Sequence, residues 1–166
     1  TLTGGTGNDY LDGGENGTSV GAGDYANYSD ITTGGVNVNL SLTTAQNTVN
    51  AGTDTLINLE NLIGSSFDDT LQGTSGDNTL LGGSGNDTLI SSGSSALGYD
   101  YIDGGAGADD LLSFKSETQG VVVDLSNADV QDTGTGNIQV KNIENLEGGS
   151  NNDTLYGSSK DNEIHG

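Results

Sequence analysis

Apolar residues recur at every ninth position along much of the chain, each in a short run between turns rich in Gly and Asp. The clearest stretch is 64–90, where GSSFDDTLQ, GTSGDNTLL and GGSGNDTLI follow one another without a gap. Further copies begin at Gly4, Ser95, Gly104, Gly148 and Gly157. The eighth position is apolar in every copy: Leu11, Leu71, Leu80, Leu89, Ile102, Leu111, Leu155 and Ile164. This period predicts a repeat architecture in which each nonapeptide contributes one short strand.

Each nonapeptide divides into about six residues of turn and about three of strand, and no stretch shows helical periodicity. Two consecutive nonapeptides would form one coil of a flattened solenoid, with the strands of successive coils about 4.8 Å apart. The eighth residue would point inward and its two neighbours outward. The pattern therefore predicts an all-β fold, a parallel β-roll or β-solenoid with a thin core of Leu and Ile.

A longer period is superimposed on the nonapeptides. The segment 56–78 (LINLENLIGSSFDDTLQGTSGDN) matches 140–162 (VKNIENLEGGSNNDTLYGSSKDN) at an offset of 84 residues. The segment before each match interrupts the repeats, and the alternation of Val36, Val38 and Leu40 with asparagine predicts an inserted β segment there. The chain is thus expected to contain two related modules.

We expect the two modules to form one continuous solenoid. Their predicted bounds are 1–112, with an insertion at about 25–63, and 113–166, with an insertion at 113–147 and repeats at 148–166. Four residues, SSGS at 91–94, also interrupt the first module and are expected to bulge from one half-coil.

The composition limits how such a chain can fold. Its 166 residues carry 24 acidic side chains against three lysines and no arginine, for a formal net charge of −21. Only 30% of the residues are apolar, so the chain stays disordered unless something outside it neutralises the charge. The acidity argues against nucleic acid as a partner, and no apolar run is long enough for membrane insertion.

The chain has no cysteine, which excludes disulfides and thiolate metal sites and leaves oxygen atoms as ligands. The acidic, glycine-rich turns of the repeats therefore favour calcium, which takes 6–8 oxygen ligands at about 2.3–2.6 Å. One aspartate per turn cannot supply so many ligands, so backbone carbonyls must converge. Glycines at the first, second and fourth positions permit this approach of the backbone to an ion. Because each turn lies over the turn two nonapeptides earlier, one nonapeptide is expected to be half a site.

The best predicted site lies between turns 82–87 and 104–109, and pairs Asp87 with Asp109. Asp9 is expected to pair with Asp24 of the distorted turn 13–24. The full set of predicted metal ligands, including glycines whose carbonyls would face an ion, is Gly5, Gly7, Asp9, Asp24, Asp68, Asp69, Gly76, Asn78, Gly83, Gly85, Asp87, Gly98, Asp100, Gly105, Gly107, Asp109 and Asp153.

Two features depart from this scheme. Turn 157–162 is not expected to hold a tight site, because Lys160 occupies the fourth position and Asn162 carries no charge. Glu60 and Glu144, in the matching triplets LEN and IEN, either cap a neighbouring turn or bond backbone amides.

The pattern GGxGxDxUx, in which U is apolar, resembles the RTX or haemolysin-type calcium-binding nonapeptide repeat. The resemblance implies a right-handed parallel β-roll with several calcium ions in its turns. It also implies export by type I secretion and residence outside the cell or at the bacterial cell surface, where calcium drives folding.

The favoured function is a non-catalytic calcium-binding module, a spacer or folding segment of a secreted adhesin, toxin or hydrolase. Because the chain begins and ends within repeats, we expect it to be a piece of a longer parent chain. The main alternative is a carbohydrate- or other ligand-binding accessory domain of a secreted enzyme, whose partner would be a surface glycan or a protein. An ice-binding solenoid, a disordered acidic linker and an enzyme are further alternatives. No serine has a partnered histidine, so no catalytic residue is predicted.

Overall fold

The computed structural model describes residues 1–15, 23–92 and 98–166, and over these ranges the chain forms short strands and no helix. The strands are β1 (Tyr10–Asp12), β2 (Tyr25–Asn27), β3 (Asn37–Asn39), β4 (Gln46–Asn47), β5 (Thr53–Ile57), β6 (Asn61–Ile63), β7 (Thr70–Gln72), β8 (Thr79–Ser84), β9 (Thr88–Ile90), β10 (Tyr99–Ala106), β11 (Leu111–Ser113), β12 (Val122–Asp124), β13 (Gln131–Asp132), β14 (Asn137–Lys141), β15 (Asn145–Glu147), β16 (Thr154–Tyr156) and β17 (Ile164–His165). Within these ranges, no helix is present that could cross a membrane.

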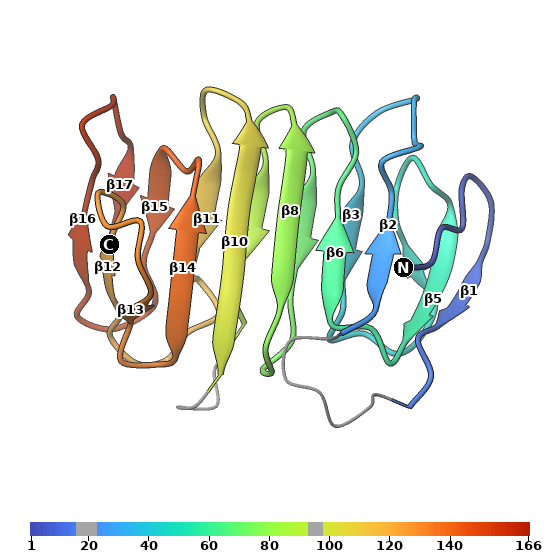
Figure 1. Ribbon diagram of the computed structural model, residues 1–166, viewed down its shortest axis with the longest axis horizontal. Coiled ribbons are helices and arrows are strands. Elements are labelled where there is room, and N and C mark those ends of the chain that lie inside the picture. Colours follow the sequence, from blue (N-terminus) through green and yellow to red (C-terminus); the bar gives the residue numbers. More distant parts are fainter. Residues whose placement is uncertain (16–22, 93–97) are drawn as a thin grey trace.

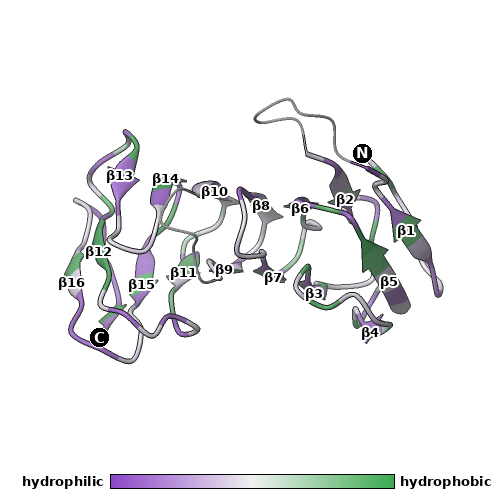
Figure 2. Cartoon of the chain, turned by 90° about the horizontal axis from the view of Figure 1, so that it is seen from below, coloured by the Kyte–Doolittle hydropathy of each residue, from purple (hydrophilic) through white to green (hydrophobic). Residues whose placement is uncertain are grey.

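Two six-stranded sheets face each other and form the body of a flattened roll (Figures 1 and 2). One sheet has the order β13-β14-β10-β8-β6-β2, and the other has the order β17-β15-β11-β9-β7-β3. Neighbouring strands are parallel except for the pair β13–β14. The smaller groups β1-β5-β4 and β12-β16 lie toward the two ends of the roll (Figure 1). The predicted all-β parallel roll is confirmed.

The register of the central strands shows that two nonapeptides make one coil. Thr70 of β7 lies beside Thr88 of β9, and Asn61 of β6 lies beside Thr79 of β8. The next coil is longer, since Thr79 pairs with Tyr101 of β10. The insertion 91–94 accounts for the extra length, but residues 93 and 94 lie outside the described ranges, and so does the predicted bulge.

The core is a double row of aliphatic side chains between the two sheets. The eighth-position residues Leu71, Leu80, Leu89 and Ile102 are fully buried, and Leu11 is nearly so. Each such side chain contributes about 1.5–3 kcal/mol by leaving water. The row continues into the insertions through Leu62, Val38, Val123 and Leu146, which are also fully buried.

The register of the 104–112 repeat differs from the prediction by one residue. Leu112 lies beside Leu89 and is fully buried, whereas Leu111 lies beside Thr88 and is partly exposed. The turn therefore contains one more residue than a standard nonapeptide, and Asp110 precedes the strand where Asp109 was expected. Ile164 was also expected to point inward, but it is 41% exposed in the edge strand β17.

The two inserted segments have the same organisation. Each contains a short antiparallel hairpin, β4–β5 in the first segment and β13–β14 in the second. The strand that precedes each hairpin pairs with a nonapeptide strand, β3 with β7 and β12 with β16. Strands β10 and β11 pair directly with β14 and β15, so hydrogen-bonded sheets cross the predicted module boundary.

Candidate functional site

The turns that connect β6 to β7, β8 to β9 and β10 to β11 stack along one edge of the roll, at the top in Figure 1. Their backbones approach so closely that side chains are excluded at some positions. Gly83 has a φ of +114°, and a Cβ added there would overlap the carbonyl oxygen of Ser65 in the preceding coil. Gly85 has the same φ and lies against the backbone of Phe67. The glycines thus permit both the conformation and the stacking distance.

A row of hydrogen bonds links the acidic residues of these turns from coil to coil. The NH of Asp69 donates to Oδ1 of Asp87 at 2.8 Å, and the NH of Asp87 donates to Oδ1 of Asp110 at 2.8 Å. The NH of Asp110 donates to Oε2 of Glu144 at 3.2 Å. We call these four residues, Asp69, Asp87, Asp110 and Glu144, the carboxylate row. All four are at least 95% buried.

Two members of the carboxylate row keep one oxygen without a partner. Oδ2 of Asp87 and Oδ2 of Asp110 are buried, and neither accepts a hydrogen bond within the described residues. A backbone carbonyl oxygen lies near each of these two oxygens. A Cβ added at Gly82 would overlap both Asp87 Oδ2 and the carbonyl oxygen of Gly104, and one at Gly104 would crowd both Asp110 Oδ2 and the carbonyl oxygen of Asn142. Each open carboxylate oxygen therefore lies near a carbonyl oxygen of the following coil.

This arrangement fits calcium better than it fits a metal held by side chains alone. Among the described residues, no three His, Cys, Asp or Glu side chains converge on one point. The groups found at each position are oxygens, one from a carboxylate that supplies negative charge and one from a backbone carbonyl. A hard cation that accepts carbonyl ligands suits that donor set.

Burial makes these carboxylates costly to ionise without a cation. Burial raises the pKa of Asp87 to about 7, and the charges of Asp69 and Asp110 add to the increase. Burial also raises the pKa of Asp69 and of Asp110 above their ordinary value of 3.8. In Asp110 the charge of Glu144 adds to this increase and that of Lys160 opposes it. The turns thus concentrate unpaired negative charge, which a bound cation would neutralise.

At the opposite edge of the roll, Asp100 and Asn78 have hydrogen-bond partners within the chain. Asp100 accepts hydrogen bonds from the NH of Asn78 at 2.9 Å and from the hydroxyl of Ser91 at 3.2 Å. Asn78 accepts from the NH of Thr74 and donates from Nδ2 to the carbonyl oxygen of Glu60 at 2.7 Å. Burial raises the pKa of Asp100 to about 6.

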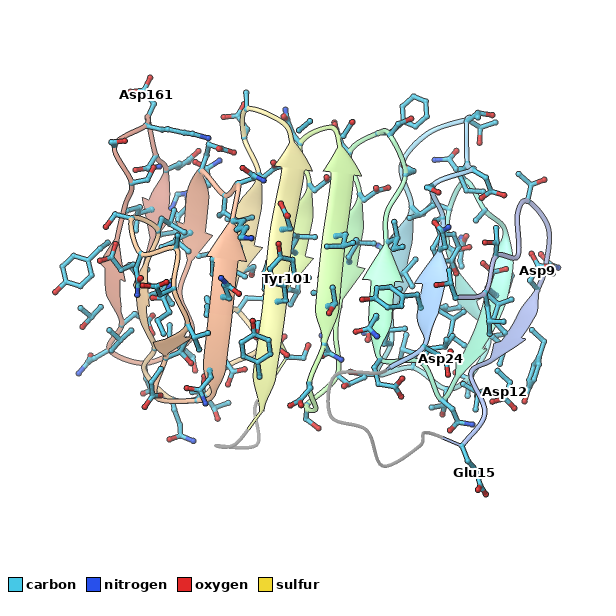
Figure 3. All side chains as sticks on the ribbon, in the orientation of Figure 1. Asp9, Asp12, Glu15, Asp24, Tyr101 and Asp161 are labelled. Atoms are coloured by element: carbon cyan, nitrogen blue, oxygen red, sulfur yellow. The ribbon has the colours of Figure 1, made fainter. Side chains whose placement is uncertain are left out.

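Asp9 pairs with a residue that the repeat pattern does not identify. Its NH donates to Oδ1 of Asp54 at 3.0 Å, and β1 pairs with β5. Oδ2 of Asp54 accepts from the hydroxyls of Tyr28 at 3.1 Å and Thr48 at 3.0 Å. The expected pairing of Asp9 with Asp24 was wrong, because β1 pairs with β5 whereas Asp24 precedes β2, which pairs with β6, and the two aspartates lie apart in Figure 3. Oδ2 of Asp9 is a third buried oxygen that has no hydrogen-bond partner in the described part of the chain.

Glu60 and Glu144 bond backbone amides, which was one of the two roles proposed for them. Oε2 of Glu60 accepts from the NH of Asp24 at 2.9 Å, as Glu144 accepts from the NH of Asp110. Asp24 and Asp110 are therefore equivalent residues in the two halves of the chain.

The remaining predicted ligands are distributed as follows. Asp109 is exposed; Asp68 is exposed and accepts from the NH of Asn86 at 2.8 Å. Asp153 accepts from the NH groups of Val121 and Gly149, each at 2.9 Å. Positive φ is found at Gly5, Gly7 and Gly105 but not at Gly76 or Gly107, and the carbonyl of Gly98 accepts from the NH of Asn137.

The tyrosines of β10 contact the neighbouring strand, as expected for cross-strand packing. The hydroxyl of Tyr99 donates to Oε1 of Gln139 at 2.9 Å, and Nζ of Lys141 lies 5.2 Å from the ring centroid of Tyr101 (Figure 3). Both partners belong to β14.

Comparison with protein families identifies the repeats. The model of the RTX calcium-binding nonapeptide repeat matches the chain in four copies, at residues 1–16, 61–93, 97–113 and 146–166. These ranges cover more than half of the chain and include Asp9, Asp87 and Asp110 but not Asp54. No curated protein matches the chain.

Proposed function

Because this chain belongs to the RTX calcium-binding nonapeptide repeat family, we propose that it is a non-catalytic structural module whose turns hold calcium ions between adjacent coils. The observation that carries the proposal is a pair of buried oxygens, Oδ2 of Asp87 and Oδ2 of Asp110. Neither has a hydrogen-bond partner within the described residues, and each lies near a backbone carbonyl oxygen. These two carboxylates, with carbonyl oxygens of Gly104 and Asn142, are the groups that would hold the ions.

The residues of each turn have separate roles in this mechanism. Oδ1 of Asp110 holds the backbone of the preceding coil through the NH of Asp87, while Oδ2 remains available. Bound calcium supplies the positive charge that the chain itself lacks at these positions. Since an unpaired buried charge opposes folding, the free energy of binding becomes free energy of folding. One site stabilises the fold by about 2.7 kcal/mol when calcium is at 100 times its Kd.

RTX repeats occur in secreted bacterial proteins, in which folding that depends on calcium would take place after export. We place the module outside the cell or at the bacterial cell surface, after export by type I secretion. At low cytoplasmic calcium the chain would remain unfolded, and at extracellular calcium it would become a stiff roll. Such a roll suits a spacer or folding segment within a longer adhesin, toxin or hydrolase.

Far-UV circular dichroism of the chain, recorded in chelator, in calcium and in magnesium, tests the proposal. We expect a coil spectrum in chelator, a β spectrum in calcium, and reversal when chelator is restored. Magnesium should be much less effective, because it retains its water and demands near-octahedral geometry. Identical spectra in calcium and in chelator, together with no calcium bound in equilibrium dialysis, would overturn the proposal.

A further inference from the structure

The carboxylate row ends at Glu144, and there the chain provides its own cation. Nζ of Lys160 lies 2.6 Å from Oε1 of Glu144, whose other oxygen accepts the NH of Asp110. The Glu144 side chain is 6% exposed and the Lys160 side chain is 61% exposed, so a lysine from the surface neutralises a buried acid. The two preceding members of the row, Asp87 and Asp110, instead leave an oxygen open.

The turn that carries Lys160 is closed by contacts within the chain. The NH of Ser158 donates to Oδ1 of Asn162 at 2.7 Å, and Nδ2 of Asn162 donates to the carbonyl oxygen of Glu144 at 2.6 Å. Both side-chain atoms of Asn162 are thereby used. An aspartate in this position could not donate to that carbonyl, so the neutral residue matches the local backbone.

The turn at 73–78 in the first half of the chain corresponds to turn 157–162 but has no lysine, so it provides a direct comparison. Asn78 lies 84 residues before Asn162 and donates in the same way to the carbonyl oxygen of Glu60 at 2.7 Å. The residue that corresponds to Lys160 is Gly76. The asparagine contact is therefore common to both turns, whereas the ammonium is particular to the second. Lys160 is one of only three lysines in a chain with 24 acidic residues.

We propose that the Lys160 ammonium is the resident cation of the last position in the carboxylate row, so that turn 157–162 closes the array without binding calcium. The inference rests on the proposed function, because it assumes that earlier positions of the row take calcium. It deepens that function by setting where the array ends. Removing the lysine leaves Glu144 buried without a counter-charge, a state that favours uptake of an ion.

The first test measures the rate of reductive methylation of each lysine by mass spectrometry. The rates are compared between the lowest calcium concentration at which the chain is folded and a saturating concentration. We expect Lys160 to react about threefold more slowly than the exposed Lys115, because the ion pair restrains its ammonium. The ratio should stay constant as calcium saturates. A rise in Lys160 reactivity at saturating calcium would show that the ion displaces the ammonium, and would overturn the inference. The variant Glu144→Gln should abolish the protection if it folds.

The second test counts calcium ions bound at saturation by equilibrium dialysis. The double variant Lys160→Gly/Asn162→Asp places glycine and aspartate at the fourth and sixth positions, and should bind one more ion than the unaltered chain. Lys160→Arg keeps the positive charge and should bind the same number as the unaltered chain. If the unaltered chain binds no calcium, the proposed function fails. If it binds calcium and the double variant binds no more, only the inference about Lys160 fails.

Discussion

The NH of Asp87 donates a 2.8 Å hydrogen bond to Oδ1 of Asp110, which lies 23 residues later in the chain and one coil further along the roll. The two oxygens of the Asp110 carboxylate therefore have different roles. One oxygen fixes the spacing of adjacent backbones, and the other stays open inside the turn. An exposed aspartate in the same turn, Asp109, takes no part in the carboxylate row.

Asp110→Asn should weaken calcium binding more than Asp109→Asn does. The first substitution removes a charge from the carboxylate that faces the turn, and calcium affinity falls by about tenfold or more when a charged ligand is lost. Isothermal titration with calcium measures the difference. Equal effects of the two substitutions would contradict the register that places Asp110 in the row.

Leu112→Ala should destabilise the calcium-bound roll by about 2–5 kcal/mol, because Leu112 is fully buried beside Leu89 and Leu146. Leu111→Ala is the matched control, since Leu111 lies in the same strand with its side chain on the other face of the sheet. Urea denaturation at saturating calcium gives both free energies of unfolding. A larger loss from the Leu111 substitution would refute the observed register.

Gly83→Ala should be more damaging than Gly14→Ala. Both glycines have positive φ, which costs an alanine about 1–2 kcal/mol. At Gly83 the new Cβ would overlap a neighbouring coil. At Gly14, apart from the glycine and its chain neighbours, no atom of the described residues lies within 4 Å of that position. Comparison of the two urea midpoints separates the cost of the backbone conformation from the cost of close stacking. Similar midpoints would mean that stacking contributes little.

The metal-free chain should become more stable as the pH falls from 8 to 5. In the folded chain the pKa of Asp87 is about 7 and that of Asp100 about 6, against an ordinary value of 3.8. Between those limits the folded chain binds more protons than the unfolded chain, so the free energy of unfolding decreases as the pH rises through this window. Bound calcium should reduce the trend, because it stabilises the ionised carboxylates.

Circular dichroism of metal-stripped protein at several pH values, recorded without denaturant, measures this dependence as a gain of β signal over the coil spectrum toward pH 5. Asp87→Asn provides the control, since it removes the group with the higher pKa and should flatten the curve between pH 6 and about 7. A β signal that grows with rising pH in the absence of calcium would contradict the prediction.

The nine-residue period was sufficient to predict the layered roll, the stacking of alternate turns and most of the core. The error at residues 104–112 has a local cause, because Asp109–Asp110 and Leu111–Leu112 are pairs of identical residues. A shift of one position still places an aspartate at the sixth position and a leucine at the eighth, and packing against Leu89 decides between the registers. Alignment of the aromatic residues Tyr28 and Phe114 would have given the observed register, since it places Asp24 opposite Asp110.

Asp54 could not be found from the period at all. It lies in the first insertion, outside the family match, and reaches Asp9 only because β5 pairs with β1 across 45 residues. Its two hydroxyl partners, Tyr28 and Thr48, come from separate segments of the insertion. The Lys160–Glu144 pair was missed for a related reason: the lysine was recognised as a departure from the pattern, but its partner lies one coil earlier.

The amides of five acidic residues in the turns donate in the same direction along the chain, although the amides of Asn86 and Tyr99 donate to the earlier acids Asp68 and Asp77. The NH groups of Asp9, Asp24, Asp69, Asp87 and Asp110 each donate to an acid that comes later in the sequence. A newly made coil therefore cannot satisfy these amides itself and must wait for residues that follow it. The hydrogen bonds of each such turn can form only once the following coil exists, so the roll cannot assemble from isolated single coils.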